Sequence, residues 1–382
     1  MYIKLTEPII NLALSDNEGS DSARELLYYL DIAIRLGKHF VFCSYEVLTL
    51  LSNLQESYKG LKGLHEMFAE YGAIASTFDW HAEFILDGDS YKDENHHIIF
   101  INYKNVPSFE LYVETRLICE HLNDAVVYNL ILTEYKNKHG LGIDSNFYPM
   151  LGGGSTTAIV YEHEINEAKT FILCLSDSDF KFYDSALGDT ARKIKCIDNK
   201  YKSFNSYYYH LTQLSESENI IPLTVYRQYV DNKNDDGMKE ICKAFEKIKG
   251  TDSRYLCYLD FKKGITLHRL QNIKENDNIK DIAAIVVEDV DSYIGEKTSQ
   301  IQAEISHIND IQLREEQFKL QCKKNQLLRG FGDNILDNVL KFIKKQNVTD
   351  VFHDATDSQL YEIEQIGKLL YDWSAAMKPI KS

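Results

Sequence analysis

Hydrophobic and polar positions along the chain follow both helical and strand periods, which predicts a mixed α/β protein. In the first third, apolar residues recur at helical spacing over 22–35 and 45–70, and short apolar runs typical of strands occupy 40–42 and 98–101. Because both periods alternate within about a hundred residues, we expect an α/β region at 1–105.

Helical spacing dominates from residue 231 onward, which predicts a mostly helical region at 231–382. Two apolar segments, at 255–259 and 283–287, interrupt this spacing and are expected to be strands or buried segments. Between the two outer regions lies a central region at 106–230, which carries the candidate chemistry.

In the central region, predicted strands and helices alternate. The pattern predicts, in order, a strand at 109–113, a helix at 116–136, a strand at 147–151, a helix at 156–168 and a strand at 171–175. Strands joined by helices in this way are typical of a parallel sheet, because parallel strands need a crossover connection.

Acidic residues directly follow two of these predicted strands: Glu114 after 109–113, and Asp177 and Asp179 after 171–175. The carboxyl ends of parallel strands meet at one edge of a sheet, where ligands bind. Three carboxylates would repel one another there unless a hard divalent cation neutralised them, and oxygen ligands suit Mg²⁺ or Mn²⁺. The sequence therefore predicts a metal site suited to phosphoryl-transfer or nuclease chemistry.

A glycine-rich turn joins the predicted strand at 147–151 to the following helix. Its backbone amides, in Gly152, Gly153, Gly154 and Ser155, could receive a phosphate at a helix N-terminus. The turn could equally be a tight connection in which Ser155 or Thr156 caps the helix. The sequence leaves both alternatives open.

The chain is acidic, with a net charge of -16 from 42 Lys and Arg against 58 Asp and Glu, so it would repel nucleic acid unless basic residues gather locally. Lys181 and Lys193 belong to a basic run that could bind phosphates or could be a solvated face. Lys262 and Lys263 could place a cation near the cleft, with a solvated turn as the alternative. The run 207–210 could stack bases, although packing is the more common role of such aromatic residues.

The chain has no apolar run long enough to span a membrane, and its seven cysteines show no C-x-x-C spacing. We therefore expect neither a disulfide framework nor a zinc ribbon. The first residues include Glu7 and Pro8 where a secretory signal needs an unbroken apolar stretch, so the expected location is the cytoplasm, without a membrane partner.

Three segments together resemble the topoisomerase-primase (TOPRIM) domain, most closely the TOPRIM nucleases of the overcoming-lysogenization-defect type and related phage-defence effectors. The segments are Leu111-Tyr112-Val113-Glu114, Gly152-Gly153-Gly154 and Leu175-Ser176-Asp177-Ser178-Asp179. Residues 215–222 also resemble the E-x-E-N segment of those nucleases. The resemblance spans roughly 106 to 225 and implies Mg²⁺ held by Glu114, Asp177 and Asp179, with Glu218, and Glu216 as a second candidate, as further metal-linked carboxylates.

Two positions differ from the family pattern. Thr115 stands where many members have a glycine after the Glu, and the nearest Asp beyond Glu114 is Asp124. Glu120 and Glu162 are therefore alternative candidates for the position of Glu114.

The resemblance implies a Mg²⁺-dependent nuclease that acts on DNA or RNA as an antiviral defence effector or toxin. The implied partners are a nucleic-acid substrate, a regulatory protein such as an ATPase, and a second copy of the chain. Two alternatives remain: a D-x-D nucleotide-sugar transferase that uses Mn²⁺, and a non-enzymatic interaction module whose acids cap a sheet edge.

Overall fold

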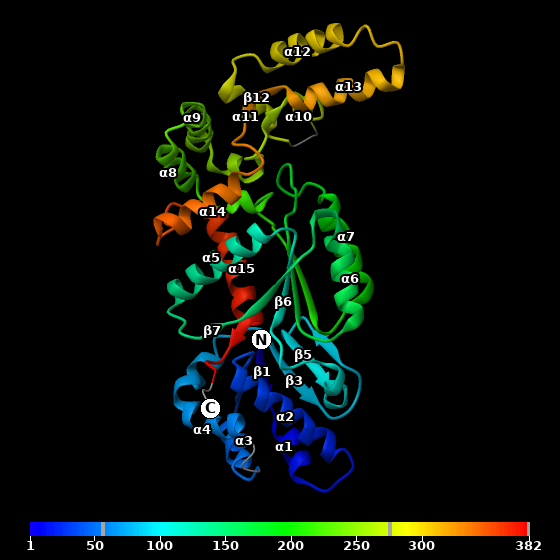
Figure 1. The fold of residues 1–382 in the computed structure, drawn as a ribbon, viewed down its shortest axis with the longest axis vertical. Coiled ribbons are helices and arrows are strands. Elements are labelled where there is room, and N and C mark those ends of the chain that lie inside the picture. The colour runs from blue at the N-terminus through cyan, green and yellow to red at the C-terminus, as the bar shows by residue number, and fades with distance from the viewer. Residues whose placement is uncertain (55–57, 274–276, 380–382) are drawn as a thin grey trace. The chain divides into compact units, whose positions relative to one another are not determined.

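The computed structural model describes residues 1–54, 58–273 and 277–379, and these form two compact units (Figure 1). The first unit comprises 1–176, 189–210 and 364–382, and the second comprises 177–188 and 211–363. Each unit is assembled from segments that lie far apart in the sequence. No helix of the described residues is both long and apolar enough to cross a membrane.

The first unit contains a five-stranded sheet in the order β2-β1-β3-β5-β4, in which only β4 runs antiparallel to its neighbour. Its strands are β1 (Tyr2–Leu5), β2 (Phe40–Cys43), β3 (His81–Ile85), β4 (Tyr91–Asp93) and β5 (Ile98–Asn102). The strands predicted at 40–42 and 98–101 are therefore confirmed.

Four helices accompany this sheet: α1 (Glu7–Leu14), α2 (Ser20–Leu36), α3 (Tyr45–Leu51) and α4 (Lys59–Ala75). The helix predicted at 22–35 is confirmed as α2, whose apolar face is buried and which ends at Gly37 in a left-handed conformation. The single helix predicted at 45–70 is wrong, because the segment forms two helices, α3 and α4; residues 55–57 lie outside the described residues.

A second sheet in the first unit has four parallel strands in the order β10-β9-β6-β8. They are β6 (Thr115–Cys119), β8 (Phe147–Leu151), β9 (Ile172–Ser176) and β10 (Ser206–His210). The predicted parallel sheet is confirmed. Pro149 is tolerated in β8 because β8 is an edge strand.

Helices cover both faces of this parallel sheet (Figure 1). They are α5 (Leu122–His139), which contacts β6 and β8, and α6 (Thr157–Glu167) and α7 (Asp189–Tyr201), which pack on the other face. Ile118, Ile172 and Cys174 of the strands pack against Tyr161 and Ile165 of α6 in a buried core. The predictions of a strand at 147–151, a helix at 156–168 and a strand at 171–175 are confirmed.

The segment before this sheet differs from the prediction. A 3-10 helix, η1 (Tyr103–Ser108), precedes an irregular stretch, so the strand predicted at 109–113 is wrong. Phe109 and Leu111 are nevertheless buried, which explains why the stretch has the composition of a strand. The helix predicted at 116–136 begins later than expected, because residues 115–119 form β6 and α5 begins at Leu122.

The second unit is mostly helical, as predicted for its part of the chain. Its elements are η3 (Ser217–Ile220), α8 (Leu223–Lys233), α9 (Asp236–Thr251), η4 (Ser253–Tyr258), β11 (Gly264–Thr266), α10 (Leu267–Gln271), α11 (Ile279–Val286), α12 (Val290–Glu304), α13 (Ile311–Lys324), β12 (Gln326–Arg329) and α14 (Ile335–Gln346).

Of the two apolar segments in this part of the chain, 255–259 is largely the 3-10 helix η4, with Leu256 and Cys257 buried. A strand at 283–287 is wrong, because Ile279, Ile282 and Ala283 bury one side of the helix α11. The last helix, α15 (Asp357–Ser374), begins in the second unit and ends in the first.

Candidate functional site: a carboxylate cluster, a lysine and a basic cavity

Two glutamates and a lysine form the centre of the candidate site, within the second unit. The Nζ atom of Lys262 lies 3.2 Å from Oε2 of Glu216 and 3.0 Å from Oε1 of Glu218. The Glu218 side chain is only 5% exposed, whereas that of Lys262 is 29% exposed. One ammonium group is thus shared by two carboxylates at the edge of a buried region.

The segment that carries these glutamates is held rigidly by Asn219. Its Oδ1 accepts a hydrogen bond from the backbone N–H of Glu216, and its Nδ2 donates to the carbonyls of Leu256 and Leu259 in the η4 region. The Tyr226 hydroxyl of α8 donates to the Glu218 carbonyl at 2.8 Å. The E-x-E-N pattern therefore has a structural reason, since the Asn fixes the backbone that presents both carboxylates.

Asp177 adjoins the same segment. Its Oδ1 accepts hydrogen bonds from the N–H and the hydroxyl of Ser217, at 2.9 and 2.8 Å. Because Ser217 lies between the two glutamates in the sequence, Asp177 orients the backbone that carries them. The structure therefore brings Asp177, Glu216, Glu218 and Lys262 together.

Asp179 occupies a left-handed backbone conformation with a φ of 54°, and its N–H donates to the Ser215 carbonyl at 3.0 Å. Its side chain packs against Gly188, where an added Cβ would lie 2.0 Å from Oδ2 of Asp179. Both acids of the predicted D-x-D motif thus belong to a loop that is tied to residues 215–217.

The electrostatics of the cluster show an excess of negative charge. Burial raises the pKa of the Glu218 carboxyl, the Lys262 ammonium opposes this effect, and repulsion from Glu216 adds to it. Burial acts to lower the pKa of Lys262, but the carboxylates of Glu218, Glu216 and Asp177 outweigh it and raise that pKa. Lys262 therefore stays charged, and one ammonium does not fully offset three carboxylates.

The cluster has the chemistry of a cation site. Its donors are carboxylate oxygens, which suit a hard divalent ion, and their charge exceeds that of the lysine beside them. No group of three or more His, Cys, Asp or Glu side chains in the described part of the chain is already close enough to hold a metal ion. In this structure Lys262 supplies the positive charge.

Glu114 lies elsewhere than predicted. It immediately precedes β6, so it stands at the amino end of that strand instead of following a strand, and its Oε1 pairs with Nζ of Lys38 at 2.5 Å. The prediction that Glu114 follows a strand is wrong because 109–113 is irregular, and the argument that made Glu114 a metal ligand falls with it.

The residue that does follow β6 is Glu120. Because β6 runs parallel to β8 and β9, the carboxyl ends of these strands lie at the same edge of the sheet. Glu120 follows β6 at this edge, where β9 also ends, at Ser176. Asp124 is four residues beyond Glu120 and is buried at the start of α5, where Oδ2 accepts from the His121 N–H at 2.8 Å. The apolar run Leu117-Ile118-Cys119 is a sequence signal for a strand before Glu120, but residues 109–113 carry a similar signal before Glu114.

The glycine turn mainly connects β8 to α6, and its first two backbone N–H groups are hydrogen-bonded within the protein. The Gly152 N–H donates to the Cys119 carbonyl at 2.8 Å, and the Gly153 N–H donates to the Glu120 carbonyl at 3.0 Å. These two amides are therefore not available to a phosphate, and that part of the phosphate-binding prediction is wrong. Gly152 is required because an added Cβ would lie 2.2 Å from Oγ1 of Thr157. For Gly154 and Ser155 the phosphate role stays a prediction.

The two predicted phosphate-binding lysines lie in different units. Lys181 lines a cavity of the second unit, whereas Lys193 lies on the exposed side of α7 in the first. In β10, Tyr207 packs against Trp80 and Trp373, at ring distances of 5.2 and 6.1 Å. The packing alternative for this aromatic run therefore holds for Tyr207.

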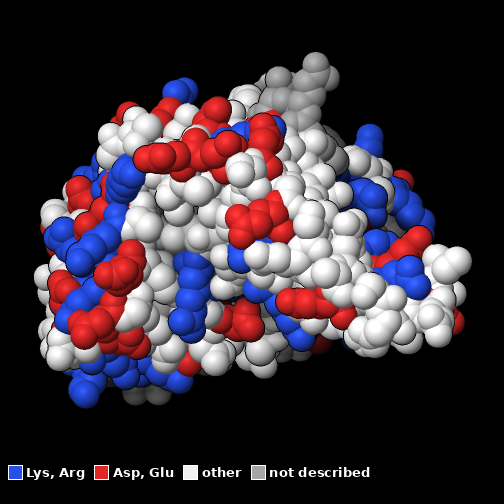
Figure 2. Space-filling view, turned by 90° about the horizontal axis from the view of Figure 1, so that it is seen from above, with Lys and Arg blue, Asp and Glu red and all other residues white. Residues whose placement is uncertain are grey.

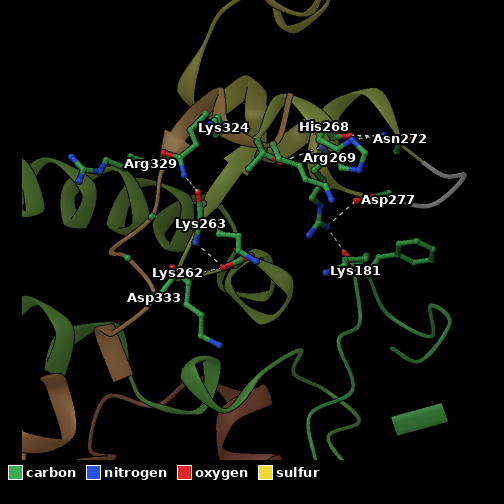
Figure 3. Close-up of a pocket in the computed structure, with 18 of the residues that line it drawn as sticks. Lys181, Lys262, Lys263, His268, Arg269, Asn272, Asp277, Lys324, Arg329 and Asp333 are labelled. Atoms are coloured by element: carbon green, nitrogen blue, oxygen red, sulfur yellow. Dashed lines mark hydrogen bonds and ion pairs between the residues drawn. The ribbon is translucent and has the colours of Figure 1, made fainter. Parts of the chain in front are cut away.

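The cavity has a volume of about 830 Å³ and is lined by residues 181–186 together with residues from β11, α10, the end of α13 and β12 (Figure 3). Its basic lining residues are Lys181, Lys262, Lys263, Arg269, Lys323, Lys324 and Arg329. Figure 3 shows Arg269, His268 and Asn272 on one side and Lys324 and Arg329 on the other, with the Arg329 side chain directed away from Arg269.

Close backbone packing builds this cavity. The antiparallel strands β11 and β12 pair closely with a glycine at the contact, since a Cβ on Gly264 would lie 2.1 Å from the Leu328 carbonyl oxygen. A Cβ on Gly330 would lie 2.3 Å from the Lys262 carbonyl oxygen. This pairing places Lys262 and Lys263 beside the segment that follows α13.

Of the three acidic residues in the lining, Asp260, Asp277 and Asp333, the first two contact other residues of the lining. Oδ1 of Asp260 accepts from the backbone N–H groups of Lys262 and Lys263, at 2.9 and 2.8 Å, and Asp277 pairs with Arg269 at 3.4 Å. On the face shown in Figure 2, by contrast, basic and acidic side chains are interspersed. With seven Lys and Arg residues against three Asp residues in its lining, the cavity concentrates positive charge within a protein whose net charge is -16.

Comparison of the chain with protein-family models, curated proteins and solved structures gave no match. The functional conclusion therefore depends on the side chains that the fold brings together. Those side chains are the carboxylates of Asp177, Glu216 and Glu218, the shared Lys262, and the basic cavity that Lys262 also lines.

Proposed function

We propose that this protein is a Mg²⁺-dependent nuclease that cleaves phosphodiester bonds in DNA or RNA. The observation that carries the proposal is that Lys262 belongs both to the carboxylate cluster and to the lining of the basic cavity. Its ammonium contacts the buried Glu218 and the half-buried Glu216, and the same residue lines a cavity rich in lysine and arginine. Carboxylates that can take a divalent cation therefore adjoin a place where phosphates can bind.

The side chains of the cluster have different proposed roles. Asp177, Glu216 and Glu218 would hold the ion, which, when bound, polarises a phosphate and lowers the pKa of a water molecule. Lys262 stays protonated and donates hydrogen bonds, so it can stabilise negative charge that develops on a phosphate oxygen. Asp177 and Asn219 position the backbone between the two glutamates.

The TOPRIM resemblance supports the same proposal, with one change. Its strand-end Glu is carried better by Glu120 than by Glu114, since Glu120 follows β6 and has Asp124 four residues beyond it. Asp177, Asp179 and the segment 216–219 remain as first assigned. We also take from the resemblance the proposed role as a cytoplasmic defence effector or toxin that a regulatory protein such as an ATPase restrains.

The test is cleavage by the purified chain of plasmid DNA, single-stranded DNA and total tRNA, with Mg²⁺, with Mn²⁺ and with a chelator. We expect cleavage of at least one substrate only when a divalent ion is present. Glu218→Gln should lower the rate by about a hundredfold or more, because it removes a carboxylate from the cluster.

Glu240→Gln is the matched control, since Glu240 is an exposed residue of α9 in the same unit. It should cleave like the wild type. Cleavage that persists in the chelator, or equal rates for the two variants, would contradict the proposal.

A further inference from the structure

Four of the five lysines that line the cavity, all except Lys262, lack the carboxylate partners that neutralise many other cations in the described part of the protein. Lys181, Lys263, Lys323 and Lys324 are exposed, and within the described residues none of them has a carboxylate partner. They come from separate segments, which the pairing of β11 with β12 and the loop 177–188 bring to one cavity. Such convergence of unpaired positive charge favours an anionic ligand.

Arg269 adds an independent sign of an anion. Its two terminal nitrogens donate to the carbonyls of Tyr258 and Lys181, at 3.2 and 2.6 Å, and one of them also contacts Asp277. Its Nε, however, is buried and has no acceptor within the described part of the chain. A buried N–H group without an acceptor is unusual, and a bound phosphate oxygen would satisfy it.

We infer that this cavity binds the phosphates of one flexible nucleic-acid strand and thereby selects single-stranded over double-stranded substrate. The inference rests on the proposed nuclease function. A cavity of about 830 Å³ is concave and of limited size. A double helix is stiff and presents its phosphates on a convex surface, whereas a single strand can bend its backbone into the cavity.

The lining also offers contacts for bases. Phe182 and His268 present flat rings, and Asn272 and Gln326 carry amide groups that can donate and accept hydrogen bonds. Lys262 connects this lining to Glu216 and Glu218, so a strand held in the cavity has one phosphate next to the carboxylates. The cavity would thus position the bond to be cleaved.

The test is equilibrium binding of a fluorescent twelve-nucleotide single strand to the wild-type chain in chelator, where cleavage is not expected. The variant Lys323→Glu/Lys324→Glu reverses two charges in the last turn of α13. We expect it to bind at least tenfold more weakly. The dependence of log Kd on log salt concentration should also become shallower, by about 0.7 for each phosphate that the variant no longer neutralises.

Lys344→Glu/Lys345→Glu is the matched control, because these lysines occupy the last turn of α14 in the same unit and carry the same penalty at a helix C-terminus. It should bind within twofold of the wild type, and thermal melts of both variants verify folding. A duplex of equal length, and inorganic triphosphate, should each compete at least tenfold less well than the unlabelled strand.

Three results would overturn the inference: normal binding by the α13 variant, equal binding of duplex and single strand, or stronger competition by triphosphate, which would indicate a site for a small phosphorylated ligand. If cleavage depends on Glu218 and the α13 variant binds normally, only the assignment of the cavity fails. If the cavity binds as expected and no substrate is cleaved, the nuclease proposal fails instead.

Discussion

At the scale of single residues, the candidate site depends on a serine that lies between two glutamates. Ser217 donates both its N–H and its hydroxyl to Asp177, and the neighbouring Glu216 and Glu218 share Lys262. Asp177 therefore has a structural task as an acceptor in addition to its proposed role at the cation. Two substitutions at this position can separate the two tasks.

Asp177→Asn keeps an oxygen that can accept from Ser217 but loses the charge, whereas Asp177→Ala loses both. We expect both variants to lose cleavage. Urea unfolding should show a loss of about 1–3 kcal/mol for the Ala variant, because two donors lose their acceptor, and a smaller loss for the Asn variant. Equal stability of the two variants would show that the Ser217 contacts do not orient this segment.

Lys262 allows a second test that does not depend on activity. Lys262→Met leaves Glu218 buried without its partner, which should lower the free energy of unfolding by about 2–4 kcal/mol. Because a divalent ion can replace the ammonium, millimolar Mg²⁺ should raise the melting temperature of this variant more than that of the wild type. The exposed neighbour Lys263→Met is the control. Absence of this additional Mg²⁺ effect would count against a cation site.

Much of the site at this scale was predictable from local sequence. Glu216, Glu218 and Asp177 were identified because E-x-E-N and D-x-D are short motifs. The role of Ser217 was not, since nothing in the sequence shows that a serine forty residues away donates to Asp177. Lys262 was predicted only as a cation near the site, and its two partners follow from the fold.

At the scale of elements, the decisive feature is where β6 begins and ends. The buried irregular stretch before β6 has the composition of a strand. The helix predicted from the sequence, in contrast, begins at residue 116, inside β6 itself. Composition and periodicity could not distinguish the two, because hydrogen bonds to β8 and β9 decide which residues form the strand. The shift moves the strand-end acid from Glu114 to Glu120.

A matched pair of variants tests this assignment. Glu120→Gln should reduce cleavage at least tenfold, since Glu120 stands at the carboxyl edge of the sheet, where ligands of such folds bind. Glu114→Gln should retain activity and lose about 1 kcal/mol of stability or less, because it weakens only the ion pair with Lys38. The opposite pattern of rates would restore the original assignment.

At the scale of the whole molecule, residues far apart in the sequence complete the first unit. Thr115 at the start of β6 donates to the Trp373 carbonyl at 2.5 Å, and the Trp80 N–H donates to Asp372 at 3.3 Å. The sequence predicted a mostly helical C-terminal region but not the residues of the first unit that its last helix contacts. Such long-range pairing also explains why the first unit is discontinuous in sequence.

Asp372 links this packing to pH. It is fully buried, and burial raises its pKa to about 7, although Lys368 opposes the effect. Between about pH 4 and pH 7 the folded chain therefore keeps a proton that the unfolded chain has released. The free energy of unfolding consequently falls as pH rises through this range, and the penalty is complete above pH 7.

Asp372→Asn removes the titrating group, so its stability relative to the wild type should increase between pH 5 and pH 8, by up to about 3 kcal/mol. Urea unfolding of both proteins at the two pH values measures this difference. A difference that does not change with pH would show that Asp372 stays ionised in the folded protein.

The central claim is that the cluster of Asp177, Glu216 and Glu218 binds a divalent cation. The most direct measurement is titration of the purified chain with Mn²⁺, with free Mn²⁺ followed by electron paramagnetic resonance. We predict saturable binding that Mg²⁺ displaces, that Glu218→Gln weakens about tenfold or more, and that Glu240→Gln leaves unchanged. The absence of saturable binding to the wild type, or equal affinity in the two variants, would contradict the account.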